Sequence, residues 1–574
     1  MDGTDAPDRD REPETRQRKS VAAERDVEHV VANAPPRRAN RPEFGGGTQS
    51  GRFRESEATG GFHLGATLSE NATALLTSPA MTVHVQNLIN GTWCASRTGR
   101  TLARENPAAA RETVSSAPLS DAADVDAAVK AAVAAYPSWK LVPAPKRGLM
   151  IAEAGRILAE RKEALATLMT REMGKPITET RGDVQEAIDT ALLVAAQGRF
   201  LAGETVPCEL PNKFGMSIRQ PVGPCAMVTP WNFPVAIPSW KIFPALVCGN
   251  TVVLKPSELT PACAAEFVKA LMDAGVPAGV VNMVCGSGEE AGAALVAHPG
   301  IRAVSFTGST QTGSLIGETC GRLNRKVSLE MGGKNAQIVM EDGDLDLAVD
   351  GALWGAFGTT GQRCTATSRL ILHRSIAEAF TAKFLARVRT LKIGNGLHDG
   401  VNVAPLVSSE QRDRVADYVR IAKEEGAKLL CGGGVPTDPA CADGWWFEPT
   451  VFGGVTRGMR IAREEVFGPV VAILVVDSFE EAVSIHNEVD YGLSSSIYTR
   501  DVNRAFTAIR DLEAGITYVN GPTIGAEVQL PFGGVKGTGN GHREAGLQVY
   551  EFYSEWKSVY VDHSGRLQRA QIDT

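Results

Sequence analysis

The 574-residue sequence contains no long uninterrupted apolar run. A helix that crosses a bilayer needs about 18 or more such residues in a row. The most apolar stretch surrounds Trp231, and it is broken by Pro234, Pro238, Lys241 and Pro244. We therefore expect no membrane partner.

An excess of basic residues is also missing, since the formal net charge is -7. Proteins that bind nucleic acid normally present a positively charged surface to its phosphates, so nucleic acid is not an expected partner. Hydrophobic residues make up 43% of the chain and charged residues 22%, which is ordinary for a globular protein. At this length we expect about three or four domains.

The cysteines lack the spacing of a disulfide framework or a zinc site. No CxxC pair occurs, and no secretory signal opens the chain, so we expect a reducing, cytoplasmic compartment and no metal. Most of the thiols are expected to be small core residues, with Cys364 as the exception. The ten cysteines are Cys94, Cys208, Cys225, Cys248, Cys263, Cys285, Cys320, Cys364, Cys431 and Cys441.

Residues 1–80 differ in composition from everything that follows. They are dense in charges of both signs and carry additional Gly and Pro without a hydrophobic period, which predicts a disordered N-terminal extension. Their many acids argue against a transit peptide. Apolar residues first alternate at Met81, where we expect the functional chain to start.

Helical and strand patterns alternate beyond Met81. An alanine-rich helix follows Ser120 or Asp121, either of which suits an N-cap, and residues 145–173 predict one longer amphipathic helix. Four short runs rich in β-branched residues predict buried strands, namely CAMVTP, NTVVLKP, GVVNMV and AVSFTG. Strands that alternate with helices indicate a parallel α/β architecture.

Two glycine-containing loops follow strand-like runs. GSGEEA, at residues 286–291, fits the dinucleotide fingerprint but lacks the acid expected about 20 residues later, and the alternative is a tight turn into a helix. FTGSTQTGS places Gly308, Ser309 and Gly313 before a helix start, where N–H groups would meet a pyrophosphate. Neither loop alone decides whether a dinucleotide binds.

Seven strings resemble the aldehyde dehydrogenase superfamily and occur in its order, from about Met81 to Val561. The resemblance implies NAD(P)-dependent oxidation of an aldehyde to the carboxylic acid, of the hydrolytic type. The strings are VTPWNFPVAIPSWKIFPALVCGNTVVLKPSE (228–258), SLEMGGKNAQIV (328–339), FGTTGQRCTATSR (357–369), EEVFGPV (464–470), YGLSSSIYTRD (491–501), GITYVN (515–520) and PFGGVKGTGNG (531–541).

The resemblance implies three catalytic residues. Aldehyde oxidation by hydride transfer first needs a nucleophile that creates a tetrahedral oxyanion, and Cys364 stands at that position, the alternative being a small buried residue. Asn232, with the main-chain N–H of Cys364, is the implied oxyanion donor, unless it is a turn residue. Glu330 matches the base that hydrolyses the thioester, and its presence favours hydrolysis over transfer to coenzyme A. Because a free thiol is only slightly ionised at neutral pH, Arg363 is expected to favour the thiolate.

The implied cofactor is NAD, with NADP as the other candidate. Lys255 and Glu258 match residues that hold the adenosine ribose, and a carboxylate there accepts from a 2′-hydroxyl but repels a 2′-phosphate, which predicts a preference for NAD. Further residues resemble contacts to the rest of the dinucleotide. They are Gly308 and Ser309 at the pyrophosphate, Glu465 and Phe467 at the nicotinamide ribose and ring, and Trp231 in the cleft wall or in the core.

The substrate is less closely defined. Succinic semialdehyde enzymes often carry Arg where this chain has Trp240, whereas GQRCTATSR resembles α-ketoglutaric semialdehyde enzymes, and an Arg before the nucleophile occurs in the α-aminoadipic semialdehyde group. We expect Arg363 to face the pocket and bind a substrate carboxylate bidentately. The alternative is a structural Arg bonded to main-chain carbonyls, and simple aliphatic or aromatic aldehydes remain alternative substrates.

The resemblance also implies a three-part α/β subunit. A Rossmann-like NAD-binding domain would comprise residues 81–202 and 222–332, a catalytic α/β domain residues 333–530, and a small β oligomerisation arm residues 203–221 and 549–561. Residues 550–561 alternate large apolar side chains, as expected of a strand that joins a neighbour's sheet, so we expect a homodimer or homotetramer.

Two other functions stay open at this point. A cysteine-dependent esterase or acyltransferase would use Cys364 without a nicotinamide. A non-catalytic member of the superfamily would serve for binding or structure, but such chains usually lack the nucleophile or its partners, and all of these are present here.

Overall fold

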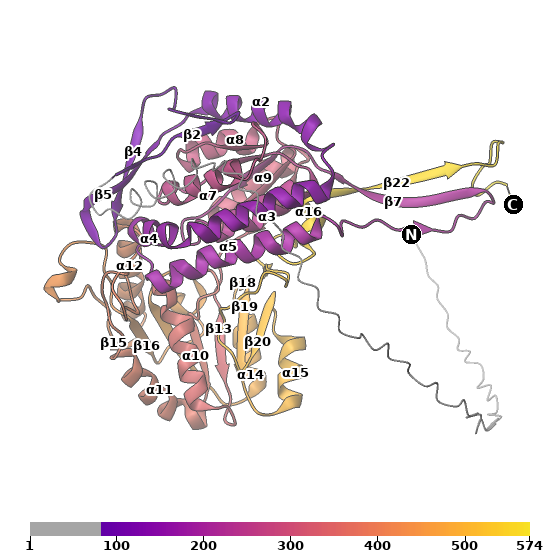
Figure 1. The fold of residues 1–574 in the computed structure, drawn as a ribbon. Helices are drawn as coiled ribbons and strands as arrows, with labels where there is room; N and C mark the ends of the chain where they lie inside the picture. The colour runs from indigo at the N-terminus through magenta and orange to yellow at the C-terminus, as the bar shows by residue number, and fades with distance from the viewer. Residues whose placement is uncertain (1–81, 574) are drawn as a thin grey trace, which may run out of the picture. The chain divides into compact units, whose positions relative to one another are not determined.

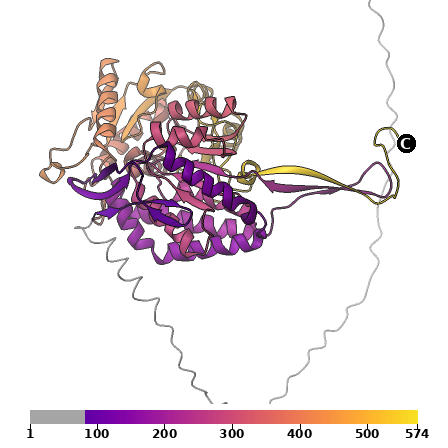
Figure 2. The ribbon, with the colours of Figure 1, turned by 90° about the horizontal axis from the view of Figure 1, so that it is seen from above.

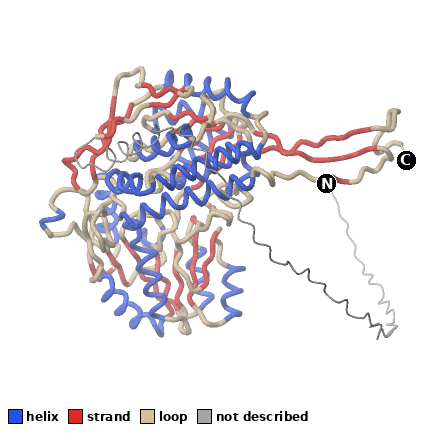
Figure 3. The backbone as a smooth tube through the Cα atoms, viewed as in Figure 1, coloured by secondary structure: helices blue, strands red, loops and turns tan. Residues whose placement is uncertain are grey.

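The computed structural model describes residues 82–573. The expected disordered extension, residues 1–80, and the expected start at Met81 lie outside the described residues. Two seven-stranded sheets with helices packed on them form most of the described part, and smaller sheets complete it (Figures 1 and 3). The expected α/β class is confirmed.

The first large sheet is mostly parallel, because β8 to β12 all run in one direction while β2 pairs antiparallel with β10 and β3. It contains all four strands expected from the β-branched runs, as β8, β9, β10 and β11. The strands in spatial order are β12 (Lys326–Glu330), β11 (Ala303–Thr307), β8 (Cys225–Val228), β9 (Val252–Lys255), β10 (Val281–Met283), β2 (Asn87–Ile89) and β3 (Thr92–Cys94).

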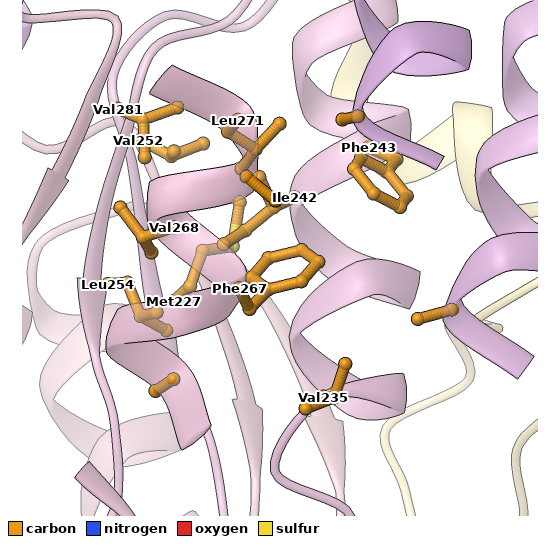
Figure 4. Close-up of a cluster of buried hydrophobic side chains, with 14 of the residues drawn as sticks. Met227, Val235, Ile242, Phe243, Val252, Leu254, Phe267, Val268, Leu271 and Val281 are labelled. Carbon is orange, nitrogen blue, oxygen red and sulfur yellow. The ribbon is translucent and has the colours of Figure 1, made fainter. Parts of the chain in front are cut away.

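Apolar side chains from two helices cover a face of this sheet (Figure 4). Phe243 of α6 (Ala236–Cys248) and Phe267 of α7 (Pro261–Asp273) have ring centroids 5.4 Å apart and belong to the same buried cluster as Met227, Val252 and Leu254. Because helices cover these strands, almost every residue of β8, β9 and β10 is buried, which explains their short apolar runs.

The second large sheet carries the later half of the chain. Its pairings are parallel except for the edge strand β15. The strands in spatial order are β15 (Lys428–Cys431), β16 (Thr450–Gly453), β17 (Val470–Val476), β14 (Arg369–His373), β13 (Ala336–Val339), β19 (Ser494–Tyr498) and β20 (Ile516–Val519).

A long two-stranded ribbon extends away from the helices (Figures 1 and 2). It pairs β7 (Lys213–Pro221) antiparallel with β22 (Ser554–Asp562) along their whole length, and β6 (Thr205–Val206) adds a short third strand. We call these three strands the arm. The remaining strands are β1 (Val83–His84), β4 (Thr101–Asn106) and β5 (Ala109–Pro118) in one small sheet, and β18 (Tyr491–Gly492) and β21 (Val535–Lys536) in another.

Two expectations about secondary structure were wrong in part. Residues 145–173 form two helices rather than one, because Arg161 leaves helical geometry at φ -96° and ψ 6° and its side chain bonds Asp273 at 2.6 Å. The segment expected as a strand from residue 550 begins as the short helix α16 and becomes β22 only at Ser554. The alanine-rich helix is capped by Asp121, whose carboxylate accepts from two N–H groups of the first turn.

The other helices connect these strands. They are α2 (Ala122–Trp139), α3 (Ala144–Glu160), α4 (Lys162–Met173), α5 (Ile177–Gln197), α8 (Ala293–Ala297), α9 (Thr310–Arg322), α10 (Leu345–Phe357), α11 (Arg374–Val388), α12 (Ser409–Glu424), α13 (Arg460–Arg463), α14 (Phe479–Asn487), α15 (Val502–Asp511) and α16 (Val549–Tyr553), with the short turns η1 (Gly288–Gly292), η2 (Gly358–Gly361) and η3 (Pro439–Cys441).

Candidate active site

The first sheet reverses its strand order between β8 and β11. From β8 the chain adds β9 and β10 on one side, and it then crosses to add β11 and β12 on the other. Ligands of open α/β sheets bind at such a switch point, beyond the carboxyl ends of the strands. The segments that follow β8, β11 and β12 line two cavities here.

The two cavities share four lining residues, Ile237, Thr307, Met331 and Cys364. We name the first the Cys364–Glu330 cavity; its other walls include Trp240, Phe532, Gly525 and Ala526. We name the second the Ser309–Glu465 cavity; its other walls include Trp231, Asn232, Gly308, Gly332, Gln411, Arg414 and Phe467. Cys364 is therefore accessible from both.

Cys364 follows a strained turn. Thr359 and Thr360 of η2 have φ values of 53° and 55°, a left-handed conformation that is costly for β-branched residues. Glu179 on α5 accepts hydrogen bonds from the main-chain N–H of Thr359 at 3.0 Å and from its hydroxyl at 2.5 Å. A carboxylate from a distant part of the chain thus holds the turn that precedes the thiol.

Asn335 holds the loop on its other side. Its amide donates to the main-chain carbonyls of Cys364 at 2.7 Å and Ala366 at 2.9 Å, and its oxygen accepts from the N–H of Ser494 at 2.9 Å. The nearby Gly333 is required as well, because a Cβ there would lie 2.5 Å from the Cys364 carbonyl oxygen.

The thiol of Cys364 is not ionised by its surroundings. Burial, together with the nearby carboxyl groups of Glu465 and Glu330, raises the pKa of Cys364 to about 12. Arg363, which we expected to favour the thiolate, is paired with Glu179 instead, at 2.5 Å. A nucleophilic Cys364 therefore needs a base to remove its proton.

Glu330 is a candidate for that base. It ends strand β12, and neither of its carboxyl oxygens accepts a hydrogen bond of ordinary geometry among residues 82–573. Burial, and then the neighbouring Glu544, raise its pKa well above the usual value. Glu544 is paired in turn with Lys241, which also donates to Ser305 at 2.9 Å. The raised pKa makes the Glu330 carboxylate a stronger base than an ordinary glutamate, which suits proton transfer.

Asn232 lines the Ser309–Glu465 cavity together with Cys364. Its amide donates to the main-chain carbonyl of Gln362 at 3.1 Å, two residues before Cys364. An amide carries two N–H groups, so the second one can donate to the oxyanion that forms on the carbon bonded to the sulfur.

The expected pyrophosphate and nicotinamide residues gather at the Ser309–Glu465 cavity. Ser309 is the N-cap of the 13-residue helix α9, whose first N–H groups suit an anion, and Gly308 precedes it. Trp231 and Phe467 meet edge to face with ring centroids 5.4 Å apart. Glu465 accepts from the N–H of Gly333 at 2.9 Å, and burial raises its pKa to about 7.

Lys255 and Glu258 lie apart from these residues. They pair with each other at 2.8 Å at the carboxyl end of β9, and neither lines the two cavities. Although burial raises it, the pKa of Glu258 is lowered overall by Lys255. The other glycine loop, around Gly286, also lines neither cavity; Ser287 caps the turn η1 there by accepting from Glu290 at 3.1 Å, as the alternative of a turn into a helix predicts.

Arg363 lines the Cys364–Glu330 cavity and a third cavity beyond it. Its guanidinium donates to Glu179 at 2.5 Å and to the hydroxyl of Thr359 at 2.8 Å, and it lies over the rings of Phe233 and Trp354. It bonds side chains, not the main-chain carbonyls of the structural alternative. Since a guanidinium has five N–H groups, some remain for a ligand.

Several site residues give no signal in the sequence. Gln411 donates to the carbonyl of Phe467 at 2.8 Å and Arg414 to that of Glu465 at 2.8 Å, and these bonds hold Phe467 at a φ of 61°. Asn335 lies within the string SLEMGGKNAQIV, but the string does not indicate that its side chain holds the Cys364 loop. Side chains that support a loop from 50 or more residues away have no local pattern.

The residues present fit a dinucleotide. The hydroxyl of Thr307, between the two cavities, is buried without a hydrogen-bond partner in the described part of the chain, and so is available to a ligand. A Cβ at Gly332 would collide with the Glu465 carboxylate, so the main chain at the cavity edge approaches that side chain closely. Together with the N-terminus of α9, these groups offer donors and acceptors for phosphate, ribose and amide.

A thiol and a carboxyl group face one cavity, and the carboxyl ends of the neighbouring strands suit a dinucleotide. This combination is typical of an oxidoreductase. The chain belongs to the aldehyde dehydrogenase family, whose sequence model matches residues 93–559. It is an NAD(P)-dependent aldehyde dehydrogenase. This membership favours aldehyde oxidation over the esterase and non-catalytic alternatives.

The chain matches similar proteins over nearly the whole length of those proteins. The alpha-ketoglutaric semialdehyde dehydrogenase of Bacillus subtilis is 40% identical over 475 residues, which cover 83% of this chain and 97% of that protein. The alpha-ketoglutarate semialdehyde dehydrogenase of Haloferax volcanii is 42% identical, with 84% and 99% covered. Among solved structures, an NAD-dependent aldehyde dehydrogenase from Sinorhizobium meliloti has a TM-score of 0.83 at 35% identity, covering 86% of this chain and 97% of that one.

No helix among residues 82–573 is long and apolar enough to cross a membrane.

Proposed function

We propose that the chain oxidises 2,5-dioxopentanoate, the semialdehyde of α-ketoglutarate, to the dicarboxylate through a thioester on Cys364. The observation that carries the chemistry is the position of Cys364 between the two cavities. Cys364 lines both cavities, so a carbon bonded to its sulfur would have Glu330 on one side and a dinucleotide bound in the Ser309–Glu465 cavity on the other. The activities named for the relatives at 40% and 42% identity support the substrate.

The catalytic steps follow from these positions. Ionised Glu330 removes the proton of Cys364, directly or through water, and the sulfur adds to the aldehyde carbon. Asn232 and the main-chain N–H of Cys364 donate to the oxyanion that forms. When bound, the nicotinamide accepts the hydride from that carbon. Glu330 then releases the thiol proton to solvent and takes a proton from the water that attacks the thioester. The thiolate leaves, the acid is released, and the proton passes from Glu330 to the sulfur, which restores the thiol.

We assign the dinucleotide to the first sheet. Gly308 and Ser309 would hold the pyrophosphate at the start of α9, and Glu465 and Phe467 the nicotinamide ribose and ring, with Trp231 in the wall. Lys255 and Glu258 would hold the adenosine ribose. This corresponds to a dinucleotide-binding domain at residues 81–202 and 222–332 and a catalytic domain at residues 333–530.

NAD is the proposed preferred form of the cofactor. Glu258 is held ionised by Lys255, as its lowered pKa indicates. An ionised carboxylate accepts from the ribose 2′-hydroxyl of NAD and repels the 2′-phosphate of NADP.

Arg363 is the proposed group for the distal carboxylate of the substrate. Among the described residues that line the Cys364–Glu330 cavity it is the one arginine, and its pairing with Glu179 fixes its orientation there. The apolar walls formed by Trp240, Phe532 and Ile237 would contact the carbon chain between the two ends of the substrate.

The arm and the residues that join it to the rest of the chain, within 203–221 and 549–561, are the proposed oligomerisation element of a homodimer or homotetramer. Its strands expose large apolar side chains that the described chain does not cover, namely Val206, Phe214, Ile218, Trp556, Tyr560 and Val561. Exposed apolar rows on a ribbon favour pairing with another subunit. Elution only as a monomer in size-exclusion chromatography would contradict this.

A cytoplasmic location is proposed on the state of the cysteines. All ten are free thiols, and four of them are half-buried, namely Cys94, Cys208, Cys364 and Cys431. Free thiols persist in a reducing compartment.

The decisive experiment is a panel of aldehydes and semialdehydes assayed at 340 nm with NAD and NADP in parallel. We expect 2,5-dioxopentanoate to show the highest kcat/KM, with NAD preferred. Cys364→Ser should abolish dinucleotide reduction with every aldehyde. A Cys364→Ser protein that reduces the dinucleotide at close to the original rate would overturn the proposed chemistry, and a higher kcat/KM for uncharged aldehydes would overturn the proposed substrate.

A further inference from the structure

Glu186 on helix α5 lies at the passage between two cavities. The Cys364–Glu330 cavity continues into a third, outer cavity, which also has Thr178, Gly182 and Trp354 in its wall. Of the residues between 82 and 573, three line both cavities: Glu186, Phe233 and Arg363. A substrate that enters through the outer cavity would pass this carboxyl group on its way to Cys364. Once the substrate is bound, its distal end would lie beside the same carboxyl group.

The other charged groups around Glu186 already have partners. Arg363 is paired with Glu179 at 2.5 Å, and Lys175 is paired with Asp183 at 2.9 Å, where both side chains are fully buried. Asp189 accepts from Gln185 at 2.8 Å on the same helix. Tyr518 on β20 is a further titratable neighbour.

The side chain of Glu186 forms no ion pair and no hydrogen bond with another residue in the described part of the chain, residues 82–573. Burial, and then the charge of Asp183, raise its pKa to about 8, against the lowering effects of Arg363 and Lys175. At neutral pH most of the protein therefore carries a protonated Glu186, which is a hydrogen-bond donor, and above that pH the group becomes an uncompensated anion.

We propose that Glu186 is a specificity-determining residue that admits carboxylated semialdehydes only in its neutral form, in which it donates a hydrogen bond to the distal carboxylate held by Arg363. This inference rests on the proposed substrate and deepens it. In the ionised form, the carboxylate of Glu186 faces the carboxylate of the substrate in the same partly buried passage, and like charges there repel strongly.

The consequence is a proton uptake linked to binding. A bound carboxylate favours the protonated form of Glu186, so above pH 8 the substrate binds together with one proton. The kcat/KM for a carboxylated semialdehyde should then fall about tenfold per pH unit relative to that for an uncharged aldehyde. Titration of Cys364, Glu330 or Glu465 affects both substrates and cancels in the ratio.

The test compares 2,5-dioxopentanoate with pentanal, an uncharged aldehyde of the same chain length, between pH 6.5 and 9.5. The measured quantity is the ratio of the two kcat/KM values. For the unmodified enzyme we expect a constant ratio up to about pH 8 and a decline of about tenfold per unit above it. Glu186→Gln, which stays neutral and keeps a donor, should give a ratio independent of pH. Glu186→Met, which has no donor, should also give a flat ratio, but a lower one at pH 7.

The matched control is Glu160→Gln, which removes an exposed carboxylate of α3 that lines none of the three cavities. It should reproduce the decline above pH 8. A decline that persists in Glu186→Gln, or a ratio in the unmodified enzyme that does not change with pH, would overturn the role of Glu186 while leaving the proposed substrate intact. Turnover of pentanal without turnover of 2,5-dioxopentanoate at any pH would overturn the proposed substrate, and the inference with it.

Discussion

The side-chain amide of Asn335 donates a hydrogen bond of 2.7 Å to the main-chain carbonyl of Cys364. A second bond to the carbonyl of Ala366 fixes the same loop at a second point. The amide therefore sets where the sulfur lies relative to the two cavities, although its own side chain does not face either of them. Asn335 is a positioning residue in this description.

Replacing Asn335 with alanine should misplace the thiol. Two buried carbonyls would lose their donor, at a cost of about 1–3 kcal/mol each, and a sulfur displaced from its attack position loses rate steeply. We expect kcat to fall about 10-fold to 100-fold. Alkylation of Cys364 by iodoacetamide should slow as well, which is a readout independent of turnover.

Asn402→Ala is the control for this prediction, because the Asn402 side chain accepts from Lys392 and lines neither of the two catalytic cavities. It should leave both kcat and alkylation unchanged. If Asn335→Ala lowered thermal stability without altering the alkylation rate, Asn335 would be structural only.

The sequence predicts the catalytic residues better than their supports. Cys364, Glu330 and Asn232 stand in strings that resemble a family, and the structure brings all three to the paired cavities. Glu179 could not be found in this way, because it holds Thr359 from 180 positions away and nothing in the local pattern of α5 marks it. Contacts across such distances arise from the packing of whole elements.

Secondary structure shows the same division. Strands buried on both sides, such as β8 and β9, were predicted from their β-branched runs. The break at Arg161 was not, because helix-favouring residues continue on both sides and the break depends on packing against later helices. Residues 550–553 belong to a helix although the alternating apolar side chains of residues 550–561 predicted a strand, since tertiary burial of Tyr550, Phe552 and Tyr553 outweighs the local pattern.

Glu330→Gln should slow both halves of the reaction. The amide cannot take the proton of Cys364 or of the attacking water, so sulfur addition and thioester hydrolysis should both slow, and the steady state should fall by about 10²-fold to 10⁴-fold. We expect dinucleotide reduction without a fast burst and with a slow steady state, measured by stopped-flow absorbance at 340 nm. Glu318→Gln, at an exposed position of α9, should show neither effect. A Glu330→Gln enzyme with an unchanged steady state would remove Glu330 from the mechanism.

Glu544→Gln should move the pH profile of kcat/KM to lower pH. The charge of Glu544 is the second cause, after burial, that raises the pKa of Glu330. Without it Glu330 loses its proton at a lower pH, so the basic form that supports catalysis is present over a wider range, and the acidic limb of the profile shifts down. Because Lys241 loses its buried partner, the free energy of unfolding should fall by about 3–5 kcal/mol, which thermal denaturation would detect. An acidic limb that stays in place, or moves up, would show that the two carboxyl groups do not interact in this way.

Glu258→Ala should weaken the preference for NAD over NADP. The variant removes the carboxylate that would repel a 2′-phosphate and leaves Lys255, its partner at 2.8 Å, free to attract one. We expect the ratio of kcat/KM for NADP to that for NAD to rise about tenfold or more, which corresponds to about 1.4 kcal/mol. Glu258→Asp keeps the charge and should keep most of the preference, so it separates the effect of charge from that of a disturbed turn after β9. Equal changes in the kcat/KM for both dinucleotides would mean that Glu258 supports the loop and does not contact the ribose.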